Sequence, residues 1–426
     1  MHKVFKFGGA SVKDSEAVIN MAQIIREHFV KDEVLVVVVS AMGKTTNALE
    51  EILYKCIDGF DYKNDLEYLK NFHINIIRGL QSANEQTIID ELEDFILQLE
   101  KSLESIKSES SISESEKYDR IVPFGELIST RILSNFFGDQ NINNSWLDAR
   151  KFVKTTNDFR EGIIKWDKSE QNILTLKDQA GLYLTQGFIG STEDGRMSTL
   201  GREGSDFTAA IFGNILNAES ITIWKDVPGI LNADPKLFKD TSQFQNLSYA
   251  EASEMTYYGA SVIHPKTIKP LANKNIPLIV KSFIKTDQDG TVISKEAARK
   301  LLPVTILKRN QALISFKVKD FTFINEEQIG LVFHALNENL IKINVMQNSA
   351  ISLTIAIDNR RDKIAALIKS LEHAFDIEKI ENLSLITIVN HEQKSISRII
   401  DYYNVILEQR TLKTCQYIIS GAVFEN

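Results

Sequence analysis

Cysteine, proline and tryptophan are all scarce in this 426-residue chain, which has two cysteines, seven prolines and three tryptophans. Cys56 and Cys415 lie far apart and belong to no Cys/His cluster, so we expect neither a disulfide framework nor a zinc site. The longest apolar run, Val34–Val39, is too short to cross a bilayer, and no signal-peptide pattern opens the chain. We therefore expect a cytoplasmic protein with no membrane partner.

Positive charge is also in deficit, because 49 lysines and arginines face 57 aspartates and glutamates, for a formal net charge of −8. Nucleic-acid-binding proteins usually present a basic face, so we expect no nucleic-acid partner. Local cations can still bind an anionic ligand. The apolar share of 43% is ordinary for a folded protein, and the length exceeds what one compact core usually serves, so we expect two or three domains.

The first 40 residues predict a strand, a helix and a second strand. Lys3–Phe7 is a strand-like segment that ends at a double glycine, Asp14–Phe29 has apolar residues near helical spacing, and Glu33–Ser40 contains an unbroken apolar run. The alternation of strands and helices continues to about residue 290, which predicts an α/β domain with a mostly parallel sheet between helices. Within it we expect several helices from residue 46 to 107, and a solvated helix end and loop over 102–117.

After residue 300 the order becomes strand, helix, strand, strand, helix, which is typical of a ferredoxin-like α+β domain. We place the boundary at the Leu301-Leu302-Pro303 turn, giving domains of residues 1–300 and 301–426. The C-terminal region divides into a first unit over residues 308–382 and a shortened second unit over 383–426. A helix is expected in the second unit from Lys394 to Ile406.

Several polar residues fall where predicted strands end or helices begin. Lys6 lies in the first strand, and Gly8 and Gly9 after it allow backbone N–H groups to approach a phosphate. Ser40 and Thr46 flank the end of the second strand, where open α/β sheets bind ligands. The nearby Gly43-Lys44-Thr45 is not a P-loop, because that motif needs a glycine where Val38 stands.

Two further segments carry charge. Glu126 lies near a helix start, where the macrodipole favours a carboxylate. Arg202 could clamp a carboxylate bidentately, and Ser205 and Asp206 follow it at the start of another helix. Each feature taken singly also fits a structural role, such as a Gly-Gly turn, a capping acid or an N-cap serine. His264, before a proline and without a metal-spaced partner, is interpreted as structural.

In order along the chain, these segments resemble the amino-acid kinase superfamily and specifically the aspartate kinases. The resemblance rests on the motifs Lys-Phe-Gly-Gly-Ala-Ser-Val (6–12), Phe-Gly-Glu (124–126), Leu-Gly-Arg-Glu-Gly-Ser-Asp (200–206), Trp-Lys-Asp-Val-Pro-Gly-Ile (224–230) and Tyr-Gly-Ala-Ser-Val-Ile-His-Pro (258–265). It covers residues 3–295, and the tail resembles the ACT regulatory region of the same family. The resemblance implies an enzyme that uses ATP and Mg²⁺ to phosphorylate the β-carboxylate of L-aspartate, the first step of lysine, threonine and methionine biosynthesis. It also implies a homodimer formed through the ACT region.

The resemblance assigns roles to individual residues. The catalytic residues would be Lys6, which contacts the transferring phosphoryl group, and Asp206. The residues expected to bind aspartate are Ser40, Thr46, Glu126, Arg202 and Ser205. The residues expected to bind ATP are Lys6, Gly8, Gly9, Lys225, Asp226, Leu231, Lys236 and Ser261. No protein-bound metal site is expected.

The chain departs from the family pattern on the nucleotide side. Lys225 replaces the usual threonine, Leu231 a tyrosine, Lys236 an arginine and Ser261 a lysine. We hypothesise that Lys225 supplies the positive charge lost at Ser261. The alternative is a catalytically weakened paralogue that acts as an amino-acid-binding regulatory subunit.

The tail also departs from the family pattern. The candidate effector residues there are Asn344 and Ser349. Because Asn344 replaces an aspartate of lysine-sensing members, inhibition by lysine is not expected. A purely structural, dimer-forming tail remains open beside an amino-acid effector site.

Overall fold

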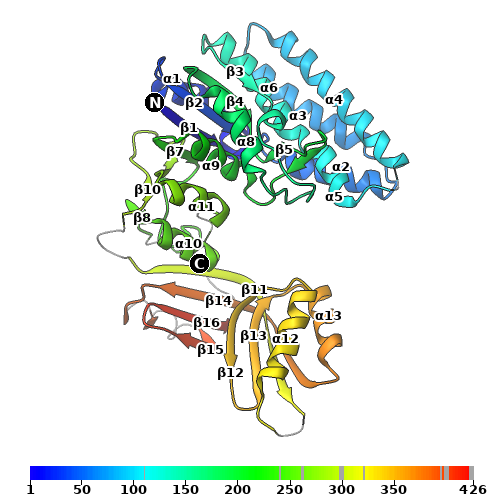
Figure 1. Cartoon of the computed structure of the whole chain (residues 1–426), viewed down its shortest axis with the longest axis vertical. Coiled ribbons are helices and arrows are strands. Elements are labelled where there is room, and N and C mark those ends of the chain that lie inside the picture. The colour runs from blue at the N-terminus through cyan, green and yellow to red at the C-terminus, as the bar shows by residue number, and fades with distance from the viewer. Residues whose placement is uncertain are drawn as a thin grey trace. The chain divides into compact units, whose positions relative to one another are not determined.

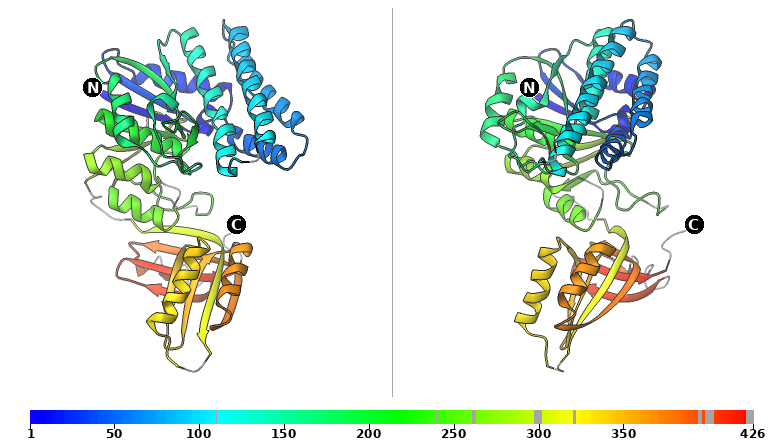
Figure 2. Two further views of the ribbon diagram at one scale, coloured as in Figure 1. Left: turned by 45° about the vertical axis from the view of Figure 1, so that its right-hand side comes forward. Right: turned by 90° about the vertical axis from the view of Figure 1, so that its right-hand side faces the viewer.

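The computed structural model describes residues 1–109, 111–238, 241–260, 263–296, 302–319, 322–393, 396–397 and 403–421. It forms two compact units, drawn in Figure 1 and, from two other directions, in Figure 2. The first contains Met1–Ile230, Gln245–Ser253 and Ile263–Ala298, and the second contains Leu231–Phe244, Glu254–Val262 and Arg299–Asn426. Two short segments before residue 300, Leu231–Phe244 and Glu254–Val262, thus group with the second unit. The domain boundary at residue 300 remains a prediction.

The first unit contains an eight-stranded sheet in the order β3-β4-β2-β1-β7-β9-β10-β8. All of its neighbouring strands run parallel except β9 and β10, as the alternation of strands and helices predicted. The strands are β1 (His2–Phe7), β2 (Val34–Val39), β3 (Ser145–Leu147), β4 (Gly181–Gln186), β7 (Ser220–Lys225), β8 (Asn246–Ser248), β9 (Leu278–Ser282) and β10 (Thr291–Ser294). A separate hairpin joins β5 (Ile189–Ser191) to β6 (Met197–Thr199).

Central strands of this sheet are buried on both faces, because helices cover each side (Figure 1). Every residue of β2 is buried, in agreement with its unbroken apolar sequence. The helix after β1 begins where the sequence predicted, since the Asp14 carboxylate caps it by accepting a 2.8 Å hydrogen bond from the Ala17 N–H. The helices and 3₁₀ turns are η1 (Gly9–Val12), α1 (Ser15–His28), α2 (Thr45–Ile57), α3 (Lys63–Gly79), α4 (Glu85–Ser108), α5 (Glu114–Ile121), α6 (Phe124–Asp139), α7 (Ala149–Phe152), α8 (Trp166–Ile173), η2 (Leu174–Leu176), α9 (Gly204–Leu216), α10 (Tyr249–Tyr257) and α11 (Pro265–Lys274).

The expected solvated helix end and loop over residues 102–117 is largely confirmed, because most described residues of this segment are exposed or half-buried. The expectation was wrong at two apolar positions and at the end of the segment. Helix α4 continues to Ser108 and buries Leu103 and Ile106, and α5 begins at Glu114 after a Ser113 cap. The buried positions of α4 are spaced three or four residues apart, so they form one apolar stripe despite the polar residues between them. None of the described helices is both long and apolar enough to span a membrane.

The second unit contains a six-stranded antiparallel sheet in the order β12-β13-β11-β14-β16-β15. Helices α12 (Glu326–Glu338) and α13 (Arg361–Leu371) pack on one face of it through a shared apolar core. Strands β11 and β14 each have 15 residues and pair with each other, and β14 crosses the predicted boundary between residues 382 and 383. The strands are β11 (Val304–Val318), β12 (Ile343–Asn348), β13 (Ser352–Asp358), β14 (Phe375–Val389), β15 (Asn404–Arg410) and β16 (Thr414–Ser420).

The expected helix from Lys394 to Ile406 was wrong at its C-terminal end. Asn404–Ile406 belong to β15, because the backbone there pairs with β16. Residues 394, 395 and 398–402 lie outside the described part of the chain.

Candidate active site

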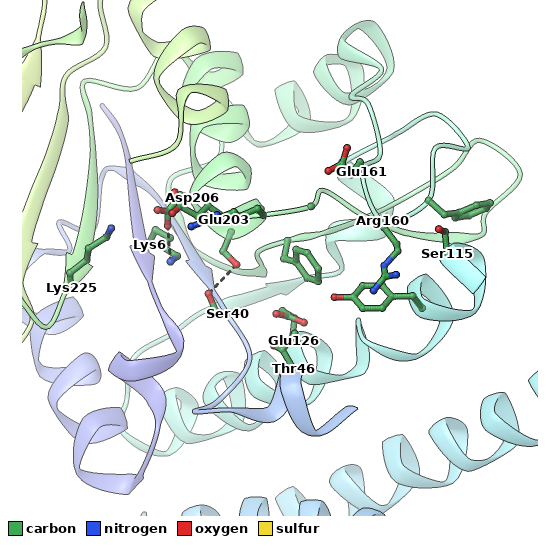
Figure 3. Close-up of a pocket in the computed structure, with 17 residues that line it drawn as sticks. Lys6, Ser40, Thr46, Ser115, Glu126, Arg160, Glu161, Glu203, Asp206 and Lys225 are labelled. Atoms are coloured by element: carbon green, nitrogen blue, oxygen red, sulfur yellow. Dashed lines mark hydrogen bonds and ion pairs between the residues drawn. The ribbon is translucent and has the colours of Figure 1, made fainter. Parts of the chain in front are cut away.

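A cavity of about 800 Å³ lies in the first unit, beside the carboxyl ends of β1, β2 and β7 (Figure 3). Parallel α/β sheets bind ligands at this edge, because the loops after each strand meet there. The cavity brings together eight residues predicted from the sequence: Lys6, Ser40, Thr46, Glu126, Arg202, Ser205, Asp206 and Lys225. Most of the predicted catalytic and acceptor site is therefore one continuous surface.

Lys6 and Asp206 form an ion pair inside this cavity. The Lys6 Nζ lies 2.7 Å from the Asp206 Oδ1, and both side chains are largely buried. Lys6 comes from the end of β1, and Asp206 comes from the first turn of α9, where the helix dipole favours a negative charge. Burial alone would raise the pKa of Asp206, but the positive charges of Lys6 and Lys225 outweigh it and hold that pKa below its ordinary value. Asp206 is therefore ionised at neutral pH.

Ser40 and Ser205 bring two hydroxyls to the same wall. The Ser40 Oγ donates to the Ser205 Oγ at 2.9 Å (Figure 3), and the Ser40 carbonyl accepts a 2.8 Å hydrogen bond from the Ser129 Oγ. Ser205 packs so tightly against Gly187 that a Cβ there would lie 2.4 Å from the Ser205 Cβ. Glycine at position 187 thus allows α9 to approach the end of β4.

Glu126 is the buried carboxyl group of the cavity. It stands in the first turn of α6 with 2% of its surface exposed, and its Oε1 accepts a 3.3 Å hydrogen bond from the Ala41 N–H. Its Oε2 is buried without a hydrogen-bond partner among the described residues. Burial raises the pKa of Glu126 to about 8, against the smaller lowering by the Ala41 hydrogen bond and the charge of Lys6. The group is mostly protonated at neutral pH until a cation approaches it.

Gly8 and Gly9 form the turn that follows Lys6, although neither lines the cavity. A Cβ on Gly9 would lie 2.9 Å from the Gly43 carbonyl oxygen and 3.0 Å from that of Ala41. The turn after β1 therefore packs directly on the backbone after β2, which fixes the position of the strand end that carries Lys6.

The remaining nucleotide-side predictions fall in different places. Lys225 ends β7 and lines the cavity, whereas Asp226 after it is exposed and does not. Leu231 and Lys236 belong to the second compact unit. Ser261 lies outside the described residues. Their roles toward ATP stay predictions.

The sequence analysis missed one wall of the cavity. Tyr118 of α5 and the segment Phe159–Glu161 line it, as does Phe188 after β4. The only local signal for this wall is the polar, glycine-ended loop Asn157–Gly162, which has no recognisable catalytic spacing.

Glu203, which belongs to the Leu-Gly-Arg-Glu-Gly-Ser-Asp motif, has a left-handed backbone with φ 54°. That conformation is disfavoured for a non-glycine residue. Its Oε2 accepts a 2.9 Å hydrogen bond from the His264 N–H. His264 in turn caps α11, because its Nδ1 accepts from the Lys266 N–H at 3.2 Å, which agrees with the predicted structural role.

The two candidate effector residues lie in or just after β12, an edge strand of the second unit's sheet. The Asn344 side chain accepts from Lys308 at 2.9 Å and donates to Gln311 at 2.7 Å and Asp358 at 3.0 Å. Ser349 closes the turn between β12 and β13, where its Oγ accepts from the Ser352 N–H at 3.1 Å. An effector role for either residue stays a prediction.

Comparison with known proteins shows the family to which the chain belongs. Residues 1–282 match the model of the amino acid kinase family. Aspartokinase 1 of Arabidopsis thaliana chloroplasts is 30% identical over 403 residues, which cover 91% of this chain and 68% of that protein. The lysine-sensitive aspartokinase 3 of Escherichia coli is 29% identical over 407 residues, which cover 91% of this chain and 87% of that protein.

Solved structures agree with the sequence matches. The crystal structure of E. coli aspartokinase III in complex with aspartate and ADP superposes with a TM-score of 0.82 and 25% identity, covering 98% of this chain and 96% of that one. The same enzyme in complex with lysine and aspartate gives a TM-score of 0.79 with 26% identity, covering 98% and 95% of the two chains. The chain therefore belongs to the amino acid kinase family and, within it, to the aspartokinases.

Proposed function

We propose that this protein is an ATP-dependent aspartate kinase, which transfers the γ-phosphoryl group of ATP to the β-carboxylate of L-aspartate. The observation that carries the proposal is the content of one cavity. A buried Lys6–Asp206 ion pair stands there with a buried, mostly protonated Glu126 and an exposed Arg202. The ion pair suits a transferring phosphoryl group, Glu126 suits an ammonium and Arg202 suits a carboxylate.

Aspartate binding follows from the groups left without partners. Arg202 makes no hydrogen bond or ion pair with another described residue, so its guanidinium can pair with the α-carboxylate. The free Oε2 of Glu126 accepts from the substrate ammonium, and Glu126 loses its proton on binding because the ammonium charge lowers its pKa. Ser40, Thr46 and Ser205 then face the β-carboxylate.

The reaction needs no protein nucleophile. A β-carboxylate oxygen attacks the γ-phosphorus, the bond from that phosphorus to the bridging oxygen of ADP breaks, and 4-phospho-L-aspartate and ADP leave. Lys6 neutralises charge on the transferring group, and Asp206 holds the Lys6 ammonium in place. Positioning and charge stabilisation by these residues supply the catalysis.

Mg²⁺ belongs to the proposal as the partner of ATP. When bound with the triphosphate, it neutralises phosphate charge. The cavity fits it through Asp206, an ionised carboxylate beside Lys6. Within the described ranges no group of three or more His, Cys, Asp and Glu side chains could hold a metal alone. A cation bound mainly through substrate phosphates has no need of such a cluster.

The proposal is tested by aspartate-dependent ADP release from MgATP, with the wild type beside Arg202→Ala. We expect turnover in the wild type and a KM for aspartate raised by roughly 10- to 100-fold in the variant, because a charge-assisted pair is lost. Aspartate that binds to the wild type without turnover would favour the weakened regulatory paralogue instead.

Lys225→Ala should raise the KM for ATP more than the KM for aspartate. Lys225 lies at the end of β7, and its charge reaches Asp206 and hence the phosphoryl end of the cavity. Loss of one phosphate contact should change the KM for ATP by about tenfold. Steady-state kinetics with each substrate varied in turn measure both constants. An unchanged KM for ATP would exclude Lys225 as a replacement for the family lysine.

We also propose a homodimer formed through the second unit. Strand β12 has a neighbour on one side only within the described sheet, and such an edge can pair with another chain. Large apolar side chains are exposed on the same unit, among them Leu331 at 44%, Met346 at 41% and Ile351 at 48%.

Negative charges at two of these exposed apolar positions should separate the subunits. We expect Met346→Glu combined with Leu331→Glu to sediment with the mass of one chain while the wild type sediments with the mass of two. Leu412→Glu is the matched control, since Leu412 is 99% exposed in the turn between β15 and β16. The proposal fails if the double variant keeps the wild-type mass.

A further inference from the structure

Arg160 is a cation of the cavity to which the proposed function gives no role. Its guanidinium lies 4.1 Å from the centre of the Tyr118 ring, and its Nη2 donates to the Tyr54 hydroxyl at 3.0 Å. The nearest carboxylate, Glu114, is 3.9 Å from Nη1 and lies at an exposed position. These contacts hold the guanidinium in one orientation and leave several of its five N–H donors for a ligand.

The backbone of Arg160 is held in an unusual conformation. Its φ is 67°, in the left-handed region that non-glycine residues rarely adopt. The Arg160 N–H donates to the Oδ2 of Asp119 at 3.0 Å, and Asp119 is fully buried. A costly conformation that a buried carboxylate stabilises is common where a side chain must point at a ligand.

Asp119 also binds the loop that carries the other arginine. Its Oδ2 accepts from the Thr199 N–H at 2.9 Å, and its Oδ1 accepts from the Thr199 hydroxyl at 2.7 Å. Thr199 ends β6, three residues before Arg202, and its carbonyl accepts from the Gly162 N–H at 2.8 Å. One buried carboxylate therefore connects the two loops that supply Arg160 and Arg202.

The position of Arg160 in the cavity matches one part of the substrate. In Figure 3, Glu126 lies between Lys6 and Arg160. An amino acid with its β-carboxylate toward Lys6 and its ammonium on Glu126 carries its α-carboxylate on the same carbon as the ammonium. That carboxylate is therefore bound next to Glu126, in the cavity that both Arg160 and Arg202 line.

We propose that Arg160 is a second substrate-binding arginine, which shares the α-carboxylate of L-aspartate with Arg202, and that Asp119 is its positioning residue. The inference rests on the proposed kinase function. A carboxylate has about four lone-pair sites, so it can accept from two guanidinium groups at once. Two arginines at this point would select substrates with a free α-carboxylate.

The test compares Arg160→Met with the wild type on two acceptors, L-aspartate and L-aspartic acid α-amide, which keeps the β-carboxylate and lacks the α-carboxylate. Arg160→Met should raise the KM for aspartate by roughly 10- to 100-fold and leave the KM for ATP unchanged. It should not weaken use of the α-amide, because that acceptor has no carboxylate for Arg160 to bind. Selectivity for aspartate over the amide should therefore fall by the same factor.

Arg196→Met is the matched control. Arg196 also lies over an aromatic ring, 5.0 Å from the centre of Phe159, and pairs with Glu116 and Asp194, but it does not line the cavity. Its KM for aspartate should remain at the wild-type value. An Arg160→Met enzyme with a wild-type KM for aspartate would overturn the inference, and so would equal losses on the two acceptors. The proposed function would survive either result, whereas a wild type without aspartate-dependent turnover would remove both.

Asp119→Asn tests the positioning role. If Asp119 acts through Arg160 and the loop of Arg202, the double variant with Arg160→Met should raise the KM for aspartate by less than the product of the two single effects. Thermal unfolding of each variant separates this result from a general loss of structure. If the increases in the KM for aspartate caused by the two substitutions simply multiply in the double variant, Asp119 does not position Arg160.

Discussion

Lys6→Met should lower kcat by about 100- to 1,000-fold, the usual loss when one preorganised charge-stabilising group is removed. Lys6 is the proposed contact of the transferring phosphoryl group, and its Nζ is fixed at 2.7 Å from Asp206. Methionine keeps the unbranched side chain and removes only the charge. Because the charge acts in the transition state, kcat should fall much more than the affinity for aspartate. Single-turnover measurements at saturating MgATP would show this directly.

The same substitution should also destabilise the protein, since it leaves Asp206 buried without its ion-pair partner. We expect a loss of about 3 kcal/mol in the free energy of unfolding, near the lower end for broken buried pairs. The double variant Lys6→Met/Asp206→Asn removes the uncompensated charge, so it should recover most of the stability and none of the activity. Recovery of activity in the double variant would falsify the catalytic role of Lys6.

Glu126→Gln should abolish a pH dependence that the wild type shows. The pKa of Glu126 is raised to about 8 by burial. Because the ionised form holds the substrate ammonium, kcat/KM for aspartate should rise about tenfold per pH unit below pH 8 and level off above it. Glutamine carries no charge at any pH, so the variant should give a flat profile, lower than the wild type by roughly 30-fold or more at pH 8.5.

Glu126 should make the free energy of unfolding fall as pH rises, whereas it makes kcat/KM increase. Between its ordinary value of 4.5 and its folded value of about 8, the folded protein holds a proton on Glu126 that the unfolded chain has released. The stabilisation that comes from this raised pKa is complete below pH 4.5 and is lost as pH rises through about 8. The stability of Glu126→Gln relative to the wild type should thus increase with pH, by about 1.4 kcal/mol per unit within that window.

Glu33→Gln is the control for both measurements. Glu33 is a buried glutamate outside the cavity, paired with Lys3 at 2.8 Å. Its kcat/KM profile should keep the wild-type rise toward pH 8. If Glu126→Gln also kept that rise, the titrating group would be another residue, and Glu126 would have no part in binding the ammonium.

The sequence determined the first unit's sheet and much of its ligand site, because both depend on local pattern. The unbroken and mostly β-branched apolar run Val34–Val39 favours a strand covered on both faces, and the Asp14 cap fixes where the helix after β1 begins. Lys6, Ser40 and Lys225 each lie at or just after the end of a parallel strand, so the topology necessarily brings them to one edge. The order of strands along the chain, read together with the family resemblance, therefore predicted that these three residues would meet.

Only the tertiary structure decided the features that depend on contacts between distant segments. The raised pKa of Glu126 comes from its burial under neighbouring elements, and nothing in Phe-Gly-Glu specifies that burial. Arg160 joins the cavity because Asp119, 41 residues earlier, stabilises its left-handed backbone. Asn404–Ile406 form a strand and not the expected helix because β16 supplies their hydrogen-bond partners. Burial, strain and strand pairing are properties of neighbours in space, and the local sequence pattern does not encode them.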